Sequence, residues 1–397
     1  QLNSLLEHYQ NGRYSDAEKS ARSLSTQFPH HNFSWKILSA VLKKTGRLSE
    51  AVFSGEKTVE ITPDDAEAHF NLGNTFKELG RLEEAEASYT QAIRLKPDFA
   101  KAHSNLGTTL KDLGRIDEAE ASYRQAIALN SDYAEAYSNL GIALKELGKH
   151  EEAITSYNKA IEIKPDFAEA YTNLGATLCS LKANGFSEAL ARNYLDVLNF
   201  GNIVRPRSIV RSIIVLLKHH DTMKEVINCK KQDTLKELAS ECCIRLSEIP
   251  LFMKVLEVCP IPDLVIEEVL IELRRILLLD RSKLSTNKDL VRFQIPLALQ
   301  CFTNEYIYEE TEDETVAIKT LEASLQKSFS NSEEPLPYDI ACLASYRSLF
   351  DYPWATDITP PPTLGLLFKR QVIEVNQERL LKKSIPSLKP IKDNVSV

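Results

Sequence analysis

Residues 66–99 read AEAHFNLGNTFKELGRLEEAEASYTQAIRLKPDF, and two more copies of this pattern follow without a gap. They are AKAHSNLGTTLKDLGRIDEAEASYRQAIALNSDY (100–133) and AEAYSNLGIALKELGKHEEAITSYNKAIEIKPDF (134–167). A weaker copy precedes them at 32–65, and 1–31 looks like a copy that lacks its first residues. A further copy begins at Ala168 and loses the pattern after Leu181. Self-similarity at a fixed period of this length predicts a repeat architecture.

Each copy reads as two amphipathic helices, A and B, joined by a short turn. Glycines in helix A let helix B approach closely, and tyrosines supply the bulk in helix B. The glycines are Gly73, Gly107 and Gly141, and the tyrosines are Tyr89, Tyr123 and Tyr157. Further glycines at 80, 114 and 148 suit the turn between the helices. Prolines at 63, 97 and 165 end helix B, and Asp-x-x-Glu at 64–67, 132–135 and 166–169 predicts capping boxes.

The pattern resembles the tetratricopeptide repeat over about half of the chain, most specifically at 66–167. This resemblance implies a right-handed superhelix whose concave groove is lined by helix A. We therefore expect an all-α fold with a tetratricopeptide solenoid at 1–200. A smaller all-α domain at 201–355 and a proline-containing linker, helix and tail at 356–397 would follow. The copies of the solenoid are expected near 1–31, 32–65, 66–99, 100–133, 134–167 and 168–200.

Positions 2, 5, 6, 9, 12 and 13 of each copy share one face of helix A, because an α-helix has 3.6 residues per turn. Position 6 is always asparagine: Asn71, Asn105, Asn139 and Asn173. An amide is both a donor and an acceptor, so such a ladder suits the backbone of an extended peptide. The alternative is that each asparagine bonds a neighbouring helix. The same ladder occurs in the repeats of O-linked N-acetylglucosamine transferases, which these copies resemble.

Two charged columns accompany the ladder. Position 12 holds Lys77, Lys111 and Lys145, and position 13 holds Glu78, Asp112 and Glu146. They would either select the charge of a partner or form a solvated face. The form of the groove that clamps a C-terminal carboxylate is matched only in part, by Asn74, Lys101 and Asn105. Phe70 stands where that clamp needs a lysine.

The second half of the chain also reads as helical. Apolar residues at helical spacing predict helices at 208–220, 233–247, 262–279, 287–309 and 315–329, and one more near 338–350. A final helix is expected around 365–383, before an extended tail. Only one of the thirteen glycines, Gly365, follows Gly201, so this half cannot form a glycine-rich phosphate or dinucleotide loop.

Segments 259–279, 295–314 and 370–397 resemble the helical region of bacterial methyltransferases that carry tetratricopeptide repeats and use S-adenosylmethionine. In that family the catalytic domain follows directly, and this chain stops where that domain would begin. No residue matches the cofactor loop of the family, so no catalytic or cofactor residue is carried over.

Composition narrows the function classes. The net charge of −8 argues against nucleic-acid binding driven by overall charge, and no apolar run is long enough to span a bilayer. Seven cysteines without a C-x-x-C pair predict reduced thiols in the cytoplasm, with no metal or cofactor site. The first methionine is Met223, so we expect the natural N-terminus to be missing or processed.

The leading hypothesis is a non-catalytic scaffold of a bacterial cell that binds a peptide or partner protein in the groove. The proposed groove residues are Asn71, Asn74, Asn105, Asn139, Asn173, Lys77, Lys101, Lys111 and Lys145. The second hypothesis is the recruiting part of a methyltransferase whose catalytic domain is present in cis or in trans. The third is an adaptor related to O-linked N-acetylglucosamine transferases.

Overall fold

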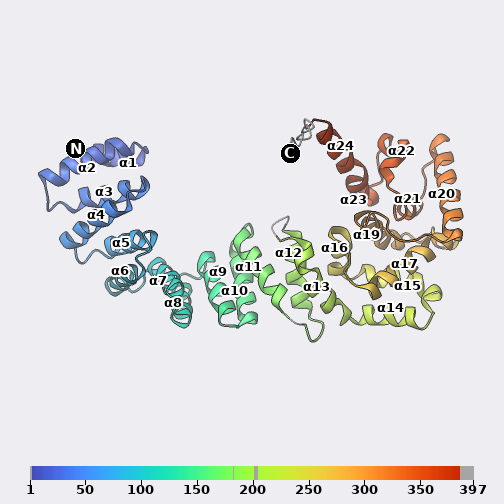
Figure 1. Cartoon of the computed structure of the whole chain (residues 1–397), viewed down its shortest axis with the longest axis horizontal. Helices are drawn as coiled ribbons and strands as arrows, with labels where there is room; N and C mark the ends of the chain where they lie inside the picture. Colours follow the sequence, from blue (N-terminus) through green and yellow to red (C-terminus); the bar gives the residue numbers. More distant parts are fainter. Residues whose placement is uncertain (1, 182, 201–203, 385–397) are drawn as a thin grey trace, which may run out of the picture. The chain divides into compact units, whose positions relative to one another are not determined.

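The computed structural model describes residues 2–181, 183–200 and 204–384, and every regular element within these ranges is a helix (Figure 1). This confirms the predicted all-α fold. By its internal contacts the chain divides into a first unit, 1–177, and a second unit, 178–397. The boundaries that the sequence placed at residues 200 and 355 stay predictions.

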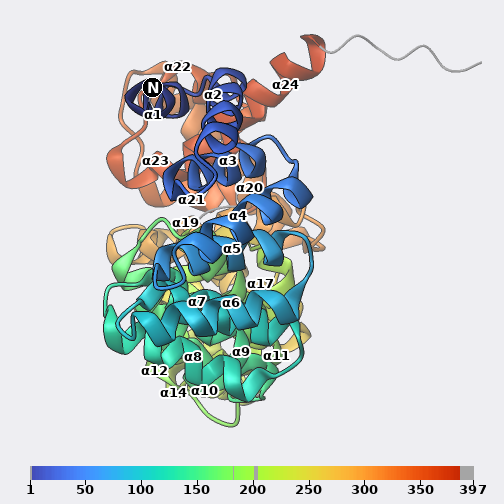
Figure 2. The ribbon, with the colours of Figure 1, turned by 90° about the vertical axis from the view of Figure 1, so that its left-hand side faces the viewer.

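The first unit is a succession of helical hairpins, and each hairpin is helix A and helix B of one copy. In Figure 2 the pairs from α3 and α4 to α9 and α10 follow one another down the view. In chain order the helices are α1 (Leu2–Gln10), α2 (Tyr14–Gln27), α3 (Asn32–Lys44), α4 (Leu48–Ile61), α5 (Ala66–Glu78), α6 (Leu82–Leu95), α7 (Ala100–Asp112), α8 (Ile116–Leu129), α9 (Ala134–Glu146), α10 (His150–Ile163) and α11 (Ala168–Ser180).

Glycine and tyrosine meet inside each of the three best copies. The tyrosine rings of helix B, Tyr89, Tyr123 and Tyr157, are completely buried. A Cβ atom added to the facing glycine of helix A would lie 2.8 Å from the ring at Gly73 and at Gly107, and 2.5 Å at Gly141. Heavy atoms do not approach that closely, so only glycine allows this packing.

The turn between helices A and B needs glycine for a different reason. Gly80, Gly114 and Gly148 have φ of 75°, 79° and 75°, in the left-handed region. In the first of these turns the Gly80 N–H donates to the Lys77 carbonyl (3.0 Å) and the Arg81 N–H donates to the Phe76 carbonyl (2.9 Å). These bonds satisfy carbonyls that the end of helix α5 would otherwise leave unpaired.

The predicted capping boxes are wrong for α5 and α9, because both helices begin one residue too late. The N-cap of α5 is Asp65, whose side chain accepts from the backbone N–H groups of Glu67 and Ala68. The N-cap of α9 is Tyr133, which makes no side-chain capping bond. The Asp64 and Asp132 of the sequence pattern therefore lie outside the cap position.

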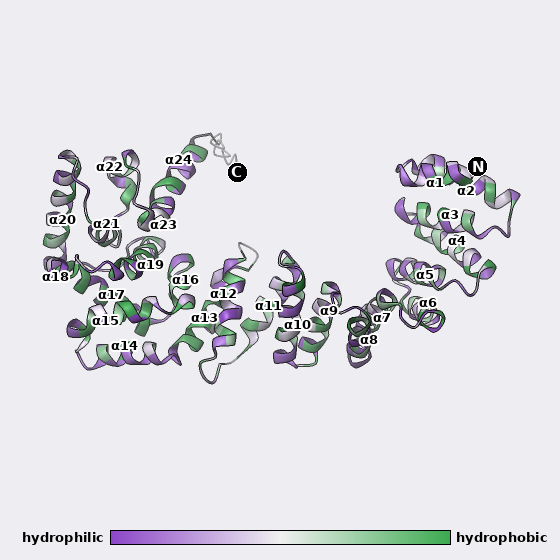
Figure 3. Cartoon of the chain, turned by 180° about the vertical axis from the view of Figure 1, so that it is seen from behind, coloured by the Kyte–Doolittle hydropathy of each residue, from purple (hydrophilic) through white to green (hydrophobic). Residues whose placement is uncertain are grey.

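The helices of the second unit vary more in length, from 4 to 19 residues. They are α12 (Glu188–Asn199), α13 (Pro206–Lys218), α14 (Asp221–Lys231), α15 (Leu235–Ser247), α16 (Pro250–Val258), α17 (Leu264–Leu279), α18 (Arg281–Leu284), α19 (Asp289–Thr303), α20 (Glu312–Ser330), α21 (Pro337–Ala344), α22 (Pro353–Asp357), α23 (Gly365–Phe368) and α24 (Glu374–Ser384). Most helices carry both hydrophobic and hydrophilic residues, as amphipathic helices do (Figure 3).

The sequence located most of the longer helices of this unit but missed others. Helices α14, α16, α18 and α22 were not expected. The helix expected at 287–309 ends at Thr303, because Glu305 and Tyr306 adopt φ of 54° and 53° and so cannot continue a helix. The expected tail from residue 385 lies outside the described residues.

Helix α19 lies at the centre of the second unit, packed against α15, α16 and α21. The segment after the predicted linker joins this core. The buried amide of Gln371 donates to the carbonyls of Ala298 (3.3 Å) and Ala344 (3.2 Å) and accepts from the N–H of Leu349 (3.1 Å). Residues 364–372 are therefore part of the folded unit.

One buried charge cluster joins α17 to α20. The carboxylate of Glu314 is completely buried, 3.6 Å from Arg274 and 3.4 Å from Arg275. It also accepts hydrogen bonds from the Tyr346 hydroxyl (2.7 Å) and from the N–H of Thr311 (2.9 Å). Burial by itself would raise the pKa of Glu314, but these hydrogen bonds and the charge of Arg274 lower it overall.

Candidate functional site

The six positions that the sequence placed on one face of helix A line a single hollow in the copy 32–65. We call this the helix-A hollow, a space of about 600 Å³. From α3 its lining residues are Phe33, Lys36, Ile37, Ala40, Lys43 and Lys44. Tyr9 of α1 and, from α5, Asn71, Thr75 and Glu78 line it as well. The face that was predicted to be concave is therefore hollowed across the first three copies.

The asparagine ladder divides into two kinds of residue. The side-chain amides of Asn71, Asn139 and Asn173 make no hydrogen bond within the described part of the chain. Asn71 is exposed and the other two are half-buried. Asn105 instead donates from Nδ2 to Oδ1 of Asn74, at 2.7 Å. Three of the four ladder amides are thus available to an external partner.

Asn74 mainly ties helices together. Its Oδ1 accepts from the Tyr89 hydroxyl of α6 (2.8 Å) as well as from Asn105 of α7. In the next copy Thr108 takes the same place and accepts from the Tyr123 hydroxyl (3.2 Å). For Asn74 and Asn105 the structure thus favours the alternative role of bonding a neighbouring helix.

The two charged columns hold lysines and carboxylates in equal number, but only some of them form ion pairs. Lys43 pairs with Glu78 of the following copy at 2.9 Å, and Lys111 lies 3.1 Å from Asp112. Burial lowers the pKa of Lys77, and the charge of Asp112 opposes this shift. Among the described residues Lys77, Lys101 and Lys145 form no ion pair. Burial desolvates Lys77 in part, which leaves Lys101 and Lys145 as the most available cations of the predicted set.

The carboxylate-clamp arrangement is only partly assembled. Asn74 and Asn105 are in contact, but no hydrogen bond joins either one to Lys101 within the described part. Phe70 stands at the position where the clamp needs a lysine. Its ring packs against those of Phe99 and Tyr89, with ring centroids 4.8 Å and 5.9 Å apart. An apolar contact therefore replaces the missing cation.

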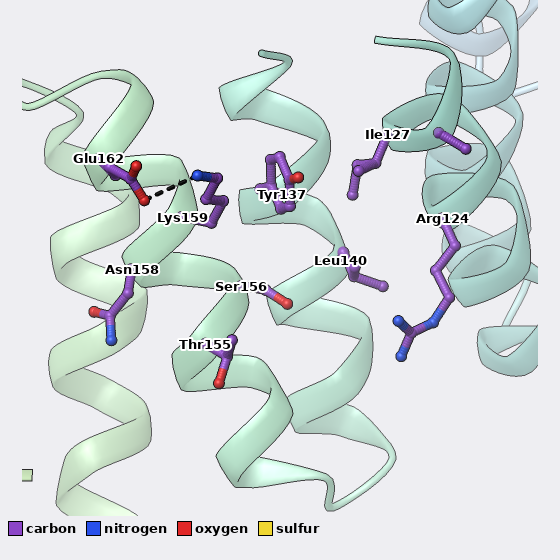
Figure 4. A pocket seen from close by; sticks show the side chains of 10 residues that line it. Arg124, Ile127, Tyr137, Leu140, Thr155, Ser156, Asn158, Lys159 and Glu162 are labelled. Carbon is purple, nitrogen blue, oxygen red and sulfur yellow. Dashed lines mark hydrogen bonds and ion pairs between the residues drawn. The ribbon is translucent and has the colours of Figure 1, made fainter. Parts of the chain in front are cut away.

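A second hollow, of about 610 Å³, lies between the B helices α8 and α10 and is drawn in Figure 4. Arg124, Tyr137 and Thr155 line it, and Lys159 pairs with Glu162 at 3.0 Å. An equivalent crevice of about 380 Å³ recurs between α2 and α4. There Arg22, Trp35 and Phe53 take the corresponding positions of the 34-residue period. A crevice that recurs with the period follows from stacking the copies and is not a specific site.

One feature of the sequence, which was not predicted to matter, sets the helix-A hollow apart. Aligned at the period of 34, Ser39 and Gly55 take the places of Gly73 and Tyr89. The copy 32–65 therefore has no tyrosine ring inside its hairpin. The alignment of the copies contains this exchange, but the copy 32–65 matches the pattern weakly, so a single missing tyrosine does not stand out.

Nucleophilic chemistry is disfavoured at the buried cysteines Cys242 and Cys259. Burial raises the pKa of Cys242 to about 12 and that of Cys259 to about 11, so both are thiols at neutral pH. In the described ranges no group of three or more His, Cys, Asp and Glu residues is arranged to hold a metal ion. None of the helices described here is both long enough and apolar enough to cross a membrane.

Comparison with protein families assigns the repeats. A TPR repeat model matches residues 73–114, 107–148 and 143–181, and a tetratricopeptide repeat model matches 55–87. These matches span less than half of the chain. Residues 55–181 therefore carry tetratricopeptide repeats, as predicted. No curated protein matches the chain, and the methyltransferase-like character of the second half stays a prediction.

Solved structures of repeat proteins align with part of the chain. YrrB, described as a TPR protein with an unusual peptide-binding site, is 20% identical, with 51% of this chain and 97% of that one covered and a TM-score of 0.38. TTC0263, a thermophilic TPR protein of Thermus thermophilus, is 26% identical, with 45% and 96% covered and a TM-score of 0.36. MamA of Desulfovibrio magneticus RS-1 is 19% identical, with 42% and 92% covered and a TM-score of 0.38. With TM-scores below 0.5, none of these alignments extends the assignment that the repeat models give.

Proposed function

We propose that the first unit is a protein-interaction scaffold whose helix-A face binds an extended peptide segment of a partner protein. The observation that carries the proposal is the set of free amides of Asn71, Asn139 and Asn173, which stand at the same position of the helices α5, α9 and α11. Each amide offers a donor and an acceptor, the pair that an extended backbone presents at every residue. A row of such amides therefore matches a peptide without depending on its side chains.

The charges of the face support a peptide rather than a nucleic acid. A carboxylate follows each lysine of position 12, in Lys77–Glu78, Lys111–Asp112 and Lys145–Glu146, so the two columns together carry no net charge. Strong binding of a phosphate backbone needs several uncompensated cations. The mixed charges instead suit a polar chain of low net charge, with Lys101 and Lys145 available for a carboxylate.

The test is a selection from a phage-displayed library of random dodecapeptides, followed by affinity measurements on synthetic peptides. The double variant Asn139→Ala/Asn173→Ala should bind the selected peptides about tenfold more weakly, since each lost hydrogen bond contributes roughly 0.5–1.5 kcal/mol. These residues are better probes than Asn105, which also holds Asn74.

Gln125→Ala is the matched control, because it removes an exposed amide from helix α8 on the opposite face of a hairpin. It should leave the affinity unchanged. If the double variant binds the selected peptides as tightly as the parent chain, the ladder has no role in binding and the proposed site is wrong.

Two further proposals rest on sequence resemblance alone. The chain would be the recruiting part of an S-adenosylmethionine-dependent methyltransferase, or an adaptor related to O-linked N-acetylglucosamine transferases. The intact mass of the protein from its source cells tests the first. A mass higher than 44.8 kDa by roughly one domain would support it, and S-adenosylmethionine binding would then be measured on that longer chain. A bacterial, cytoplasmic setting also stays a prediction.

A further inference from the structure

The copy 32–65 is built without its central ring. In the next three copies a buried tyrosine of helix B lies against a glycine of helix A. Here the tyrosine position is Gly55 and the glycine position is Ser39. The exchange removes a complete aromatic side chain and adds back only a hydroxymethyl group. The Ser39 hydroxyl donates to the Ala51 carbonyl at 2.8 Å, so it needs no further partner.

The space that the ring would take is only partly refilled. The atom nearest to the missing side chain is Cδ1 of Leu72 in the next copy, which lies 3.0 Å from the position that a Cβ on Gly55 would take. The helix-A hollow remains beside it, and its floor is formed by Gly55 and by the buried side chains of Ile37, Thr58, Ala68 and Leu72. A mainly apolar recess of this kind gains free energy when an apolar side chain fills it.

The rim of the hollow carries positive charge. Lys36, Lys43 and Lys44 line it, against Glu78 as its one lining carboxylate. Lys43 is paired with Glu78, and Lys36 lies 3.4 Å from both Asp65 and Glu67. Lys44 is exposed and has no ion-pair partner in the part of the chain described. Lys44 is therefore the lysine of the rim that can pair with a carboxylate on the occupant of the recess.

We propose that the helix-A hollow is a specificity pocket. It would take one bulky apolar side chain of the bound peptide, with an acidic residue next to that side chain held by Lys44 at the rim. The proposal rests on the proposed function, since it assumes that an extended peptide lies along helix A. The pocket would select peptides by one of their side chains. The asparagine amides cannot do this, because they bind the peptide backbone.

The dodecapeptide library tests the pocket on the full chain. The peptides selected by the parent chain should share a bulky apolar residue, such as Phe, Leu or Met, next to Asp or Glu. A fluorescein-labelled selected peptide is then compared with its analogue in which the bulky residue is Ala. We expect the analogue to bind at least tenfold more weakly, a change that requires no variant of the protein.

The matching protein variant restores the missing ring. Ser39→Gly/Gly55→Phe rebuilds the pair found in the other copies. Phenylalanine is chosen because Ala40 stands where Asn74 accepts a tyrosine hydroxyl. This variant should bind the selected peptide at least tenfold more weakly and should no longer distinguish it from the Ala analogue. Gly55→Ala, which adds one methyl group, should change the affinity less than threefold.

The outcomes separate the two proposals. If selected peptides share no bulky apolar residue, or if the ring-restored variant still distinguishes the two peptides, the pocket is refuted. The peptide-binding proposal then survives provided that Asn139→Ala/Asn173→Ala weakens binding. If the library yields no peptide that binds the parent chain, the peptide-binding proposal itself is refuted, and the pocket with it.

Discussion

At the scale of single residues, packing and backbone preference make opposite demands on the helix-A glycines. Gly107 lies inside α7, where alanine would favour the helix by about 0.8–1.0 kcal/mol. A Cβ there would lie 2.8 Å from the buried ring of Tyr123. Overpacking of this kind costs about 1–3 kcal/mol, so packing outweighs the preference for alanine.

Gly107→Ala should therefore lower the free energy of unfolding by up to about 2 kcal/mol, the difference between these two effects. Urea denaturation followed by circular dichroism measures it. Gly365→Ala is the control, because no atom lies within 4 Å of the added methyl group and the backbone φ is −54°. It should change stability by less than about 0.5 kcal/mol. A Gly107→Ala chain as stable as the parent would show that the ring can move aside.

A second prediction at this scale concerns acid. The pKa of Glu314 is lowered in the folded protein, so its carboxylate adds stability above the unfolded pKa of about 4.3. That stability is lost as the pH falls through the lower folded pKa. Glu314→Gln should destabilise the second unit at pH 7 by about 3–5 kcal/mol, because it leaves the buried Arg274 without its anion, whereas Arg275 keeps Glu272 at 3.0 Å.

The measurement is the urea midpoint of parent and Glu314→Gln between pH 3 and pH 8. The difference in urea midpoint between parent and variant should become smaller below pH 5, since the parent then loses the charge that the variant already lacks. A gap that stays constant over this range would mean that Glu314 acts through its shape and hydrogen bonds and not through its charge. Glu309→Gln, an exchange outside the cluster, is the control.

At the scale of elements, the hairpin of the copy 32–65 lacks the buried aromatic ring that packs between the helices of the next three copies. The helices α3 and α4 still form a hairpin, but no ring fills the space between Ser39 and Gly55. Burying a phenylalanine side chain contributes about 1.5–3 kcal/mol. The ring-free hairpin is therefore expected to be a weak point of the first unit.

Ser39→Gly/Gly55→Phe should accordingly raise the stability of the first unit by roughly 1–3 kcal/mol, while it weakens peptide binding. Thermal and urea unfolding of parent and variant measure the change. The opposite directions of the two effects matter, because a variant that merely misfolds would lose both stability and binding. A variant that loses stability would show that Leu72 cannot leave the space next to Gly55.

The helices of the repeats were predicted well from the sequence because the same helix-ending residues recur in each copy. Glycine at the A–B turn and proline after helix B fix where helices end, independently of distant contacts. The capping boxes failed because the cap depends on the first helical residue, which a pattern locates only to within one or two residues. Helix α19 ended early because Glu305 and Tyr306 adopt left-handed backbone, which non-glycine residues rarely signal.

The sequence could predict which face of helix A carries the candidate site, but not which of its side chains are free. The period of 3.6 residues placed Asn71 on the face that borders the helix-A hollow. It could not separate the free amide of Asn139 from the amide of Asn105, which bonds Asn74. That difference goes with the side chain at position 9 of the preceding copy, Asn74 before Asn105 and Thr108 before Asn139, a contact between copies that no single copy contains.

At the scale of the whole molecule, each copy contacts mainly its neighbours, as α4 packs on α5 and α6 on α7. The stability of such an array is close to a sum of hairpin and neighbour terms. All residues of the helix-A hollow and the four ladder asparagines lie within the first unit. The peptide site should therefore not need the second unit.

Fragment 1–200 should bind the selected peptides with an affinity within about threefold of the full chain, as near-independent stacking implies. A fragment that ends at residue 177 is the informative comparison, because it cuts α11 before Leu178, a fully buried residue. It also removes α12, whose Tyr194 hydroxyl donates to the Leu178 carbonyl at 2.9 Å. The shorter fragment should unfold at lower urea, since its last helix is incomplete and uncapped. If fragment 1–200 folds but binds more than tenfold more weakly than the full chain, residues beyond 200 take part in the site, and the assignment of binding to the first unit alone is wrong.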